Sequence, residues 1–270
     1  LEFRRVLFRS RHFYIRRVLR IVPAATLTLT ATVTVAYFLL SENFNAALIE
    51  DVRAAALFSA NFRLISTSSD YFMSGIDPSL ITHFWSLAVE EQFYFVYPLA
   101  VFSLTWLAPL RYRTAVLRLF LVVIIALSAV WSAQLTPLNA VEAYYSPFTR
   151  LWELALGGLV AVLPERWRSV YPRIAQTQAW MGAGLLTASL IVISPTSGFP
   201  GTAAWLPCLS AALFLHAGEA HSTIGLNGLL GRAPLKYIGD ISYSLYLWHY
   251  VWLILPAQLP TALDGPTTTL

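Results

Sequence analysis

The stretch from His83 to Tyr94 is the part of this 270-residue sequence best suited to chemistry. At 100° per residue, one face of a helix here carries an imidazole, a hydroxyl, a carboxylate and two phenols, from His83, Ser86, Glu90, Tyr94 and Tyr97. Ionisable groups are costly inside a membrane, so such a face within an apolar span indicates a functional site. The structural alternative places Glu90, Glu91 and Gln92 in the lipid headgroup layer, and the spacing leaves both interpretations open.

Three arginines upstream can converge on one anion. Arg16 and Arg20 are four residues apart, and Arg17 and Arg20 are three apart, so a helix brings their guanidinium groups together. The planar and permanently charged guanidinium group suits phosphate. The alternative is that these arginines only anchor the cytoplasmic end of a membrane span.

Arg150 and Glu153 form a third candidate, because residues three apart on a helix are neighbours. Pairing lowers the cost of carrying both charges at membrane depth. Gly157 and Gly158, about one turn further, permit the close approach of another helix. The pattern is equally consistent with a site and with a purely structural ion pair.

A fourth candidate is the helix predicted near the C-terminus, where Tyr243, Tyr246 and Tyr250 share one face and His249 lies in an apolar run. A single buried histidine is more often a hydrogen-bonded packing residue than a catalyst, so packing is favoured for His249. The sequence has no phosphate-cradling glycine loop, no His-Glu-x-x-His zinc helix and no Gly-x-Ser-x-Gly turn, so metal and serine-hydrolase chemistry are unsupported.

The composition places these candidates in a membrane protein. Hydrophobic residues make up 57% of the sequence and charged residues 12%, whereas a soluble domain would be about one-quarter charged. The net charge of +4 comes from short basic clusters between apolar runs, which argues against a nucleic-acid-binding patch. The single cysteine, Cys208, excludes a disulfide framework or a cysteine metal site built from this chain alone.

Seven apolar runs are candidates for membrane spans, each of which needs about 20 residues. They cover residues 22–40, 84–107, 115–134, 148–164, 178–195, 202–217 and 238–257. The runs at 148–164 and 202–217 are short, which is typical of tilted, broken or re-entrant segments. We therefore predict an all-α fold, a polytopic transmembrane helix bundle of about seven spans.

The basic residues predict which side of the membrane each loop occupies. Cytoplasmic loops carry an excess of Lys and Arg, and the clusters all fall on one predicted side, at Arg11–Arg20, Arg111–Arg118, Arg166–Arg173 and Arg232–Lys236. The long connection at 41–82 is then extracytoplasmic.

The expected domain organisation is simple. We expect residues 1–10 to be a non-native leader, residues 11–258 to form one membrane domain and residues 259–270 to be a polar tail.

Four blocks together resemble the acyltransferase-3 family of multi-span enzymes, which O-acylate cell-envelope polysaccharides, lipopolysaccharide sugars and some small molecules. The blocks occur in the family's order over most of the chain, at Phe13–Pro23, His83–Tyr94, Ser146–Gly158 and Gly239–His249. The resemblance implies a bacterial inner-membrane protein with a cytoplasmic acyl-CoA donor, most often acetyl-CoA, and an extracytoplasmic glycan acceptor. It implies no bound cofactor, no metal and no nucleic-acid partner.

The resemblance also implies residue roles. Arg16, Arg17 and Arg20 match the motif whose suggested role is to hold the donor's phosphates, and Glu90 matches an acidic position assigned to catalysis. The residues that match the other motifs would line the acceptor site, namely His83, Trp85, Ser86, Gln92, Tyr94, Arg150, Glu153, Tyr243 and His249. The family's essential histidine, which would serve as general base, belongs to a span that would lie before Arg11. The resemblance thus implies a fragment without that span, and leaves the fragment's own activity open.

The sequence as a whole predicts an enzyme that transfers an acyl group, expected to be acetyl, from a CoA thioester to a hydroxyl of a polysaccharide or lipid-linked glycan. The alternatives are a transporter or flippase of a lipid-linked glycan, in which Glu90, Arg150 and Glu153 line a pathway, and a purely structural membrane protein. Transporters often contain two corresponding halves with broken helices. The sequence has no such symmetry, which favours the enzyme.

Overall fold

The computed structural model describes residues 2–40, 46–74, 79–164, 167, 171–194, 197–218 and 225–258. Every regular element within these ranges is a helix, which confirms the predicted all-α class. The chain divides into two compact units. The terminal unit consists of Leu1–Ala88 and Ile241–Leu270, and the central unit of Val89–Asp240.

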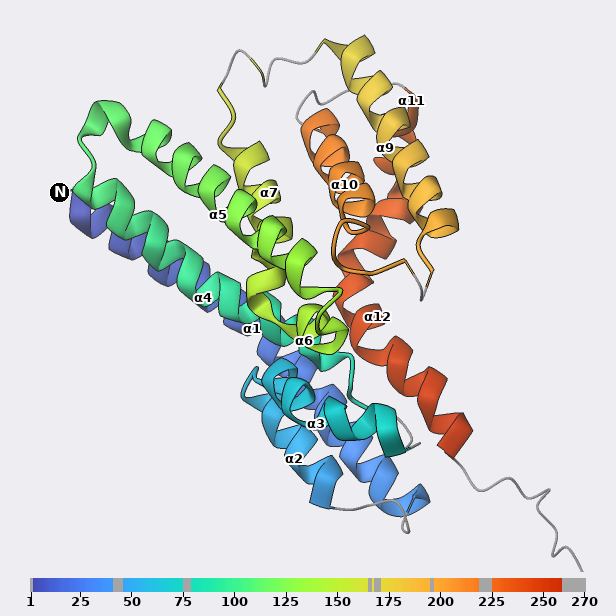
Figure 1. The fold of residues 1–270 in the computed structure, drawn as a ribbon. Coiled ribbons are helices and arrows are strands. Elements are labelled where there is room, and N and C mark those ends of the chain that lie inside the picture. The colour runs from blue at the N-terminus through green and yellow to red at the C-terminus, as the bar shows by residue number, and fades with distance from the viewer. Residues whose placement is uncertain are drawn as a thin grey trace, which may run out of the picture. The chain divides into compact units, whose positions relative to one another are not determined.

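The terminal unit is built on α1 (Glu2–Leu39), which packs against α2 (Ala46–Ala56), which in turn packs against α3 (Ala60–Ser74) (Figure 1). One stripe of α1 is buried because Ile21, Ala25 and Leu29 recur at every fourth residue. The start of α4 (Phe84–Leu107) and most of α12 (Ala233–Gln258) complete the unit. Its core joins α1 to both of them through residues that include Phe84, Leu87 and Leu247.

The predicted connection at 41–82 contains two helices, α2 and α3, rather than a single irregular loop. The physical reason lies in the apolar residues of α2, since Ala55 is buried in the terminal core and Leu48 and Val52 pack against it. A segment with one apolar face gains stability by packing against α1, and helical geometry presents that face.

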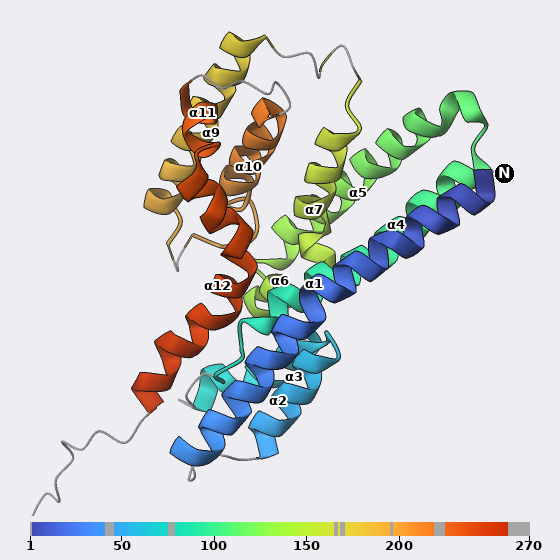
Figure 2. The same ribbon diagram turned by 180° about the vertical axis from the view of Figure 1, so that it is seen from behind.

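The central unit contains two antiparallel helix pairs, visible from both sides in Figures 1 and 2. One pair is α5 (Arg113–Leu135) with α7 (Pro147–Ala161), and the other is α9 (Pro172–Val192) with α10 (Trp205–Gly218). Short elements accompany them, namely η1 (Leu110–Tyr112), α6 (Ala140–Tyr145) and α11 (Gly225–Leu230).

Local sequence signals fix where α6 and α7 begin. The Asn139 side chain accepts a hydrogen bond from the N–H of Glu142, and Ser146 accepts one from the N–H of Phe148. Pro147 occupies the first turn of α7, where its missing N–H costs nothing. Within this pair, the Ser128 hydroxyl of α5 donates to the carbonyl of Phe148 at 2.6 Å.

Each of the seven predicted apolar runs coincides with a helix: α1, α4, α5, α7, α9, α10 and α12. Two segments of the described chain, Phe13–Leu39 and Leu110–Leu135, are long and apolar enough to cross a membrane by length and composition. With 15 and 14 residues, α7 and α10 rise only about 22 and 21 Å, less than the ~30 Å hydrocarbon core. The structure therefore supports seven apolar helices, while their number as spans stays a prediction.

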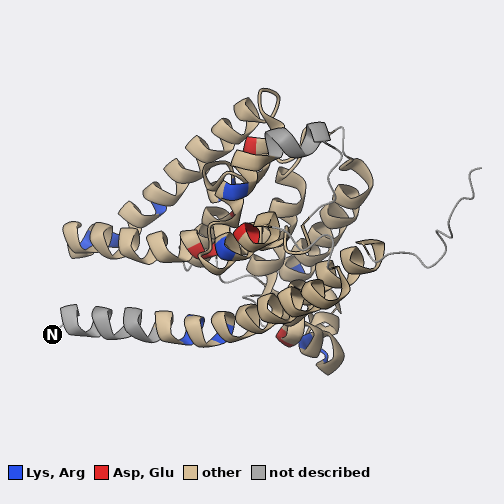
Figure 3. Cartoon of the chain, turned by 90° about the horizontal axis from the view of Figure 1, so that it is seen from below, with Lys and Arg blue, Asp and Glu red and all other residues tan. Residues whose placement is uncertain are grey.

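The outer surfaces of these helices are apolar. Charged side chains are sparse along the ribbon in Figure 3, and α1 carries none between Arg20 and its end at Leu39. Large apolar side chains are exposed along several helices, including Leu107, Leu127, Leu190 and Leu253. Extended apolar surfaces of this kind fit a lipid environment.

Gly182 controls the contact between α9 and α10. The Ser210 hydroxyl donates to its carbonyl at 2.7 Å, and a Cβ atom at Gly182 would lie 3.2 Å from the Ser210 carbonyl oxygen. At Gly184, on the same helix, a Cβ atom would meet nothing within 4 Å.

We predict that Gly182→Leu lowers the free energy of unfolding by about 1–3 kcal/mol, because the side chain overpacks this contact. The matched control Gly184→Leu should be close to wild type. Thermal unfolding of the detergent-solubilised protein, followed by tryptophan fluorescence, measures both, and equal midpoints for the two variants would contradict the packing argument.

Candidate active site

His83 lies in the turn that leads into α4, and it is only 6% exposed. Hydrogen bonds close this turn, because both the N–H and the hydroxyl of Thr82 donate to the carbonyl of Ser79, at 3.0 and 2.8 Å. The N–H of Phe84 donates to the carbonyl of Ile81 at 3.0 Å. The turn therefore holds the imidazole at a defined position in the terminal unit.

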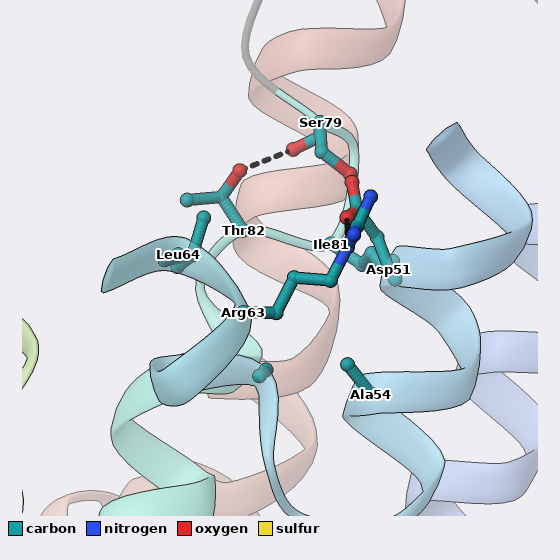
Figure 4. A pocket seen from close by; sticks show the side chains of 8 residues that line it. Asp51, Ala54, Arg63, Leu64, Ser79, Ile81 and Thr82 are labelled. Atoms are coloured by element: carbon teal, nitrogen blue, oxygen red, sulfur yellow. Dashed lines mark hydrogen bonds and ion pairs between the residues drawn. The ribbon is translucent and has the colours of Figure 1, made fainter. Parts of the chain in front are cut away.

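An ion pair between α2 and α3 lies next to this turn. The Arg63 Nε–H donates to an Asp51 carboxylate oxygen at 2.8 Å, with side chains that are 29% and 17% exposed. Figure 4 shows this pair and the Ser79–Thr82 turn around a small cavity of about 10 Å³, roughly the space for one water molecule. The Ser79 hydroxyl, which lines the cavity, is buried and has no partner within the described chain. The pair thus places α2 and α3 against the turn that carries His83.

The imidazole of His83 has a fixed tautomer. Its Nε2 lies 3.0 Å from the carbonyl oxygen of Leu247 in α12. Because a carbonyl can only accept, Nε2 carries the hydrogen and donates, and Nδ1 is left with its lone pair. That Nδ1 atom is buried and has no partner within the described chain.

Burial also sets the charge of this imidazole. Removal from water lowers the pKa of His83 to about 4, the hydrogen bond to Leu247 opposes that change, and the nearby His249 adds to it. His83 precedes the predicted span and is neutral at pH 7.

Two hydroxyl groups form a chain beside His83. The Tyr246 hydroxyl donates a short hydrogen bond to the main-chain carbonyl of His83. The single phenolic proton is used there, so at 2.7 Å the Ser86 hydroxyl donates to the Tyr246 oxygen. Tyr243, one turn earlier on α12, donates to the carbonyl of Ile21 in α1 at 3.1 Å. Three segments that are distant in sequence are thereby joined.

His249 is the solvent-exposed member of this cluster. Its Nδ1–H donates to the carbonyl of Tyr246 at 2.5 Å, the side chain is exposed, and its ring centroid lies 5.6 Å from that of His83. Tyr250 lies against His83 at a centroid distance of 5.1 Å. The favoured interpretation was a buried packing residue, whereas the side chain is exposed and bonds to its own helix, and a site role for His249 stays a prediction.

The structure thus brings together four predicted site residues from the turn before α4, from α4 itself and from α12, namely His83, Ser86, Tyr243 and His249. Trp85 packs against the same core. Tyr246 is the central member that the sequence analysis did not select, although its place on one face with Tyr243 and Tyr250 was the available signal. The shared face predicted that Tyr246 lies near Tyr243 and Tyr250. The hydrogen-bond partners of its hydroxyl could not be predicted, because they belong to the turn at His83 and to Ser86.

The other predicted residues lie further along α4, on α1 and on α7. Glu90, Gln92 and Tyr94 follow on α4 within the central unit and are half-buried. On α1, Arg16 and Arg20 are exposed and Arg17 is half-buried. The catalytic role of Glu90 and the phosphate-binding role of the arginines stay predictions.

Arg150 and Glu153 form the predicted ion pair in the central unit, at 2.9 Å between Nη1 and Oε1. The Arg150 Nε–H also donates to the carbonyl of Tyr144 at 3.3 Å. The guanidinium carbon lies 5.1 Å from the ring centroid of Tyr144 and 5.0 Å from that of Phe199. The two side chains are 9% and 23% exposed, so Arg150 is almost fully buried with its charge paired.

Comparison with known proteins assigns the family. The family model of an acyltransferase domain, acyltransferase 3, matches residues 5–263. The chain belongs to this acyltransferase family. The match contains all four blocks on which the resemblance was based, and it disfavours the transporter alternative.

Curated relatives of this acyltransferase chain are O-acetyltransferases by name. It is 28% identical, over 258 residues, to YrhL of Bacillus subtilis (strain 168), provisionally named a peptidoglycan O-acetyltransferase. It is 28% identical, over 245 residues, to the O-acetyltransferase OatA of Staphylococcus aureus (strain NCTC 8325 / PS 47). These alignments cover 91% and 88% of the chain but only 39% and 40% of the relatives. No solved structure matches the chain.

The pKa of His83 predicts a dependence of stability on pH. The folded-state value of about 4 lies below the ordinary value of 6.5. The stabilising contribution is therefore complete above pH 6.5 and is lost as the pH falls from 6.5 toward 4. Between pH 7.5 and pH 5, we expect His83 to account for a loss of about 1–2 kcal/mol in the free energy of unfolding.

This loss should be largely absent in His83→Gln, whose amide can still donate to the Leu247 carbonyl. His216→Gln, at a half-buried histidine of the central unit, is the control and should retain it. Unfolding in denaturant at the two pH values gives the comparison. An unchanged pH dependence in His83→Gln would contradict the buried neutral imidazole.

Proposed function

We propose that this chain forms the membrane domain of an O-acyltransferase that moves an acetyl group from a cytoplasmic CoA thioester to a hydroxyl of an extracytoplasmic glycan. Family membership supports acyl transfer, the names of both relatives support acetyl as the group, and the name of YrhL supports peptidoglycan as the class of acceptor. The observation that carries the proposal is the convergence of the His83–Ser86 and Tyr243–His249 segments through hydrogen bonds.

The proposed reaction is a single displacement at a carbonyl carbon. The acceptor hydroxyl oxygen forms a bond to the thioester carbon, the carbon–sulfur bond breaks, and CoA leaves with the electron pair on sulfur. The hydroxyl proton passes to a base of the enzyme and finally to the thiolate. Glu90, a half-buried carboxylate on α4, is the proposed member of this proton path.

The hydroxyl chain beside His83 has a positioning role in this proposal. The protons of Ser86 and Tyr246 are committed to neighbouring oxygens, so neither hydroxyl is an activated nucleophile. Their bonds hold the first turn of α4 against α12, and Glu90 lies one turn further along α4 from Ser86. The network therefore fixes the direction of the first turn of α4 within the terminal unit.

The proposed topology has seven spans in the bacterial inner membrane, with the arginine-rich loops in the cytoplasm and the 41–82 segment outside. The exposed Arg16 and Arg20 then face the compartment that holds acyl-CoA. Their spacing on α1 suits the phosphates of that donor, because arginine makes charge-assisted and often bidentate hydrogen bonds to phosphate.

We predict that the double variant Arg16→Ala/Arg20→Ala raises the KM for acetyl-CoA by at least about tenfold, because hydrogen bonds between charged groups are lost. The control Arg232→Ala/Lys236→Ala removes two charges from another loop on the same predicted side. O-acetylation of glycan by membranes that contain the full-length protein provides the assay. The same KM in both double variants would sink the phosphate-binding role.

We also predict that Tyr246→Phe lowers kcat by at least about tenfold while the protein still folds. The change removes one hydroxyl and with it the two hydrogen bonds that join α12 to Ser86 and to the His83 carbonyl. Tyr237→Phe, at a 64% exposed tyrosine of the same helix, is the control and should keep wild-type kcat. A Tyr246→Phe enzyme with full kcat would show that the network does not position the site.

A further inference from the structure

The environment of Arg150 contains more than an ion pair requires. The rings of Tyr144 and Phe199 have centroids 6.1 Å apart and are inclined by 57°, so they form a corner around the guanidinium group of Arg150. Arg150 lies over both rings, at nearly equal distances of 5.1 and 5.0 Å. The two rings come from α6 and from the turn that precedes α10. The guanidinium group therefore fixes two aromatic side chains from different segments relative to each other.

This aromatic corner is held rigidly from several sides. The carbonyl of Tyr144 accepts from Arg150, and the Thr149 hydroxyl donates to the carbonyls of Ala143 and Ser146 at 2.7 and 2.9 Å. On the other side, the Gly201 N–H donates to the Thr136 hydroxyl at 3.0 Å and ties the Phe199 turn to the end of α5. Preorganisation of this kind lowers the entropy cost of binding a ligand.

The charges define which ligand fits. The Arg150 charge is already paired with Glu153, so the corner does not attract an anion through an uncompensated cation. The Glu153 side chain is 23% exposed, and a carboxylate that accepts one hydrogen bond has capacity for further donors. Tyr144 and Phe199 are half-buried, so part of each ring stays accessible. The combination favours a neutral ligand with an apolar face and several hydroxyl groups.

We propose that Tyr144, Phe199 and Glu153 form a subsite for a neutral sugar ring of the acceptor. The C–H face of the sugar packs on the exposed part of each ring, away from Arg150, and a sugar hydroxyl donates to the Glu153 carboxylate. Arg150 is a positioning residue that keeps the rings and the carboxylate in place. The assignment rests on the proposed function, which supplies the glycan acceptor and places this end of α7 outside the cytoplasm.

The test is binding of chitotetraose, a neutral oligosaccharide of N-acetylglucosamine, to the whole chain in lipid nanodiscs, measured by calorimetry. Phe199→Leu and Tyr144→Leu, made separately, should each weaken binding about three- to tenfold, because one aromatic face is lost. Phe199→Tyr should restore wild-type affinity. The matched control is Phe148→Leu, which removes a 64% exposed aromatic ring near the start of α7 and should leave the dissociation constant unchanged.

Two results would overturn the subsite, namely no chitotetraose binding by the wild-type chain, or equal dissociation constants for Phe199→Leu, Tyr144→Leu and Phe148→Leu. Thermal unfolding midpoints show whether Phe199→Leu or Tyr144→Leu has lost its fold. If one has, the dissociation constant of the other tests the subsite. Acetyl-CoA consumption by the full-length protein is measured separately. If the protein binds chitotetraose but does not consume acetyl-CoA, the proposed function is contradicted and the subsite is not. If it consumes acetyl-CoA normally and the corner variants bind chitotetraose as the wild type does, only the subsite is contradicted.

Discussion

The hydrogen bond from the His83 imidazole to the main-chain carbonyl of Leu247 is the constraint on which the candidate site depends. It joins residues 164 positions apart and brings the start of α4 against α12. Burial keeps this imidazole neutral and the hydrogen bond to Leu247 places the proton on Nε2, so position, tautomer and charge are all defined. Tyr246 and Ser86 then complete their own bonds around the same turn. Each polar group in this part of the site has its geometry set by a neighbour.

His83 is buried as a neutral group, whereas Arg150 is buried as a charged one. A guanidinium group cannot lose its charge, so its burial requires a carboxylate, carbonyl acceptors or aromatic faces. Glu153, the Tyr144 carbonyl and two rings supply all three. A structural ion pair and a binding site, which the sequence left as alternatives, are therefore compatible, because the groups that stabilise the charge also form an ordered polar and aromatic surface.

Family membership and helix dimensions together describe an unusual membrane domain. Some helices have the length of an ordinary span, whereas α7 and α10 are shorter than the hydrocarbon core is thick. The Arg150–Glu153 pair lies near the start of α7. The curated relatives are more than twice as long as the aligned region, so this domain acts beside other segments in those proteins.

The sequence by itself determined the all-α class, the seven apolar helices and the family, because each follows from local composition or from residues close together in the chain. The Arg150–Glu153 pair was predictable for the same reason, since side chains three positions apart on a helix are neighbours. Helices α2 and α3 were missed, because α2 is stabilised by packing on α1, and α3 by packing on α2, rather than by a strong local pattern. The hydrogen bond from the Tyr246 hydroxyl to the His83 carbonyl joins segments more than a hundred residues apart. The contact between the rings of Tyr144 and Phe199 joins segments dozens of residues apart. No local pattern encodes such partners, and only the tertiary structure decides them, since it brings those segments within hydrogen-bonding or van der Waals distance.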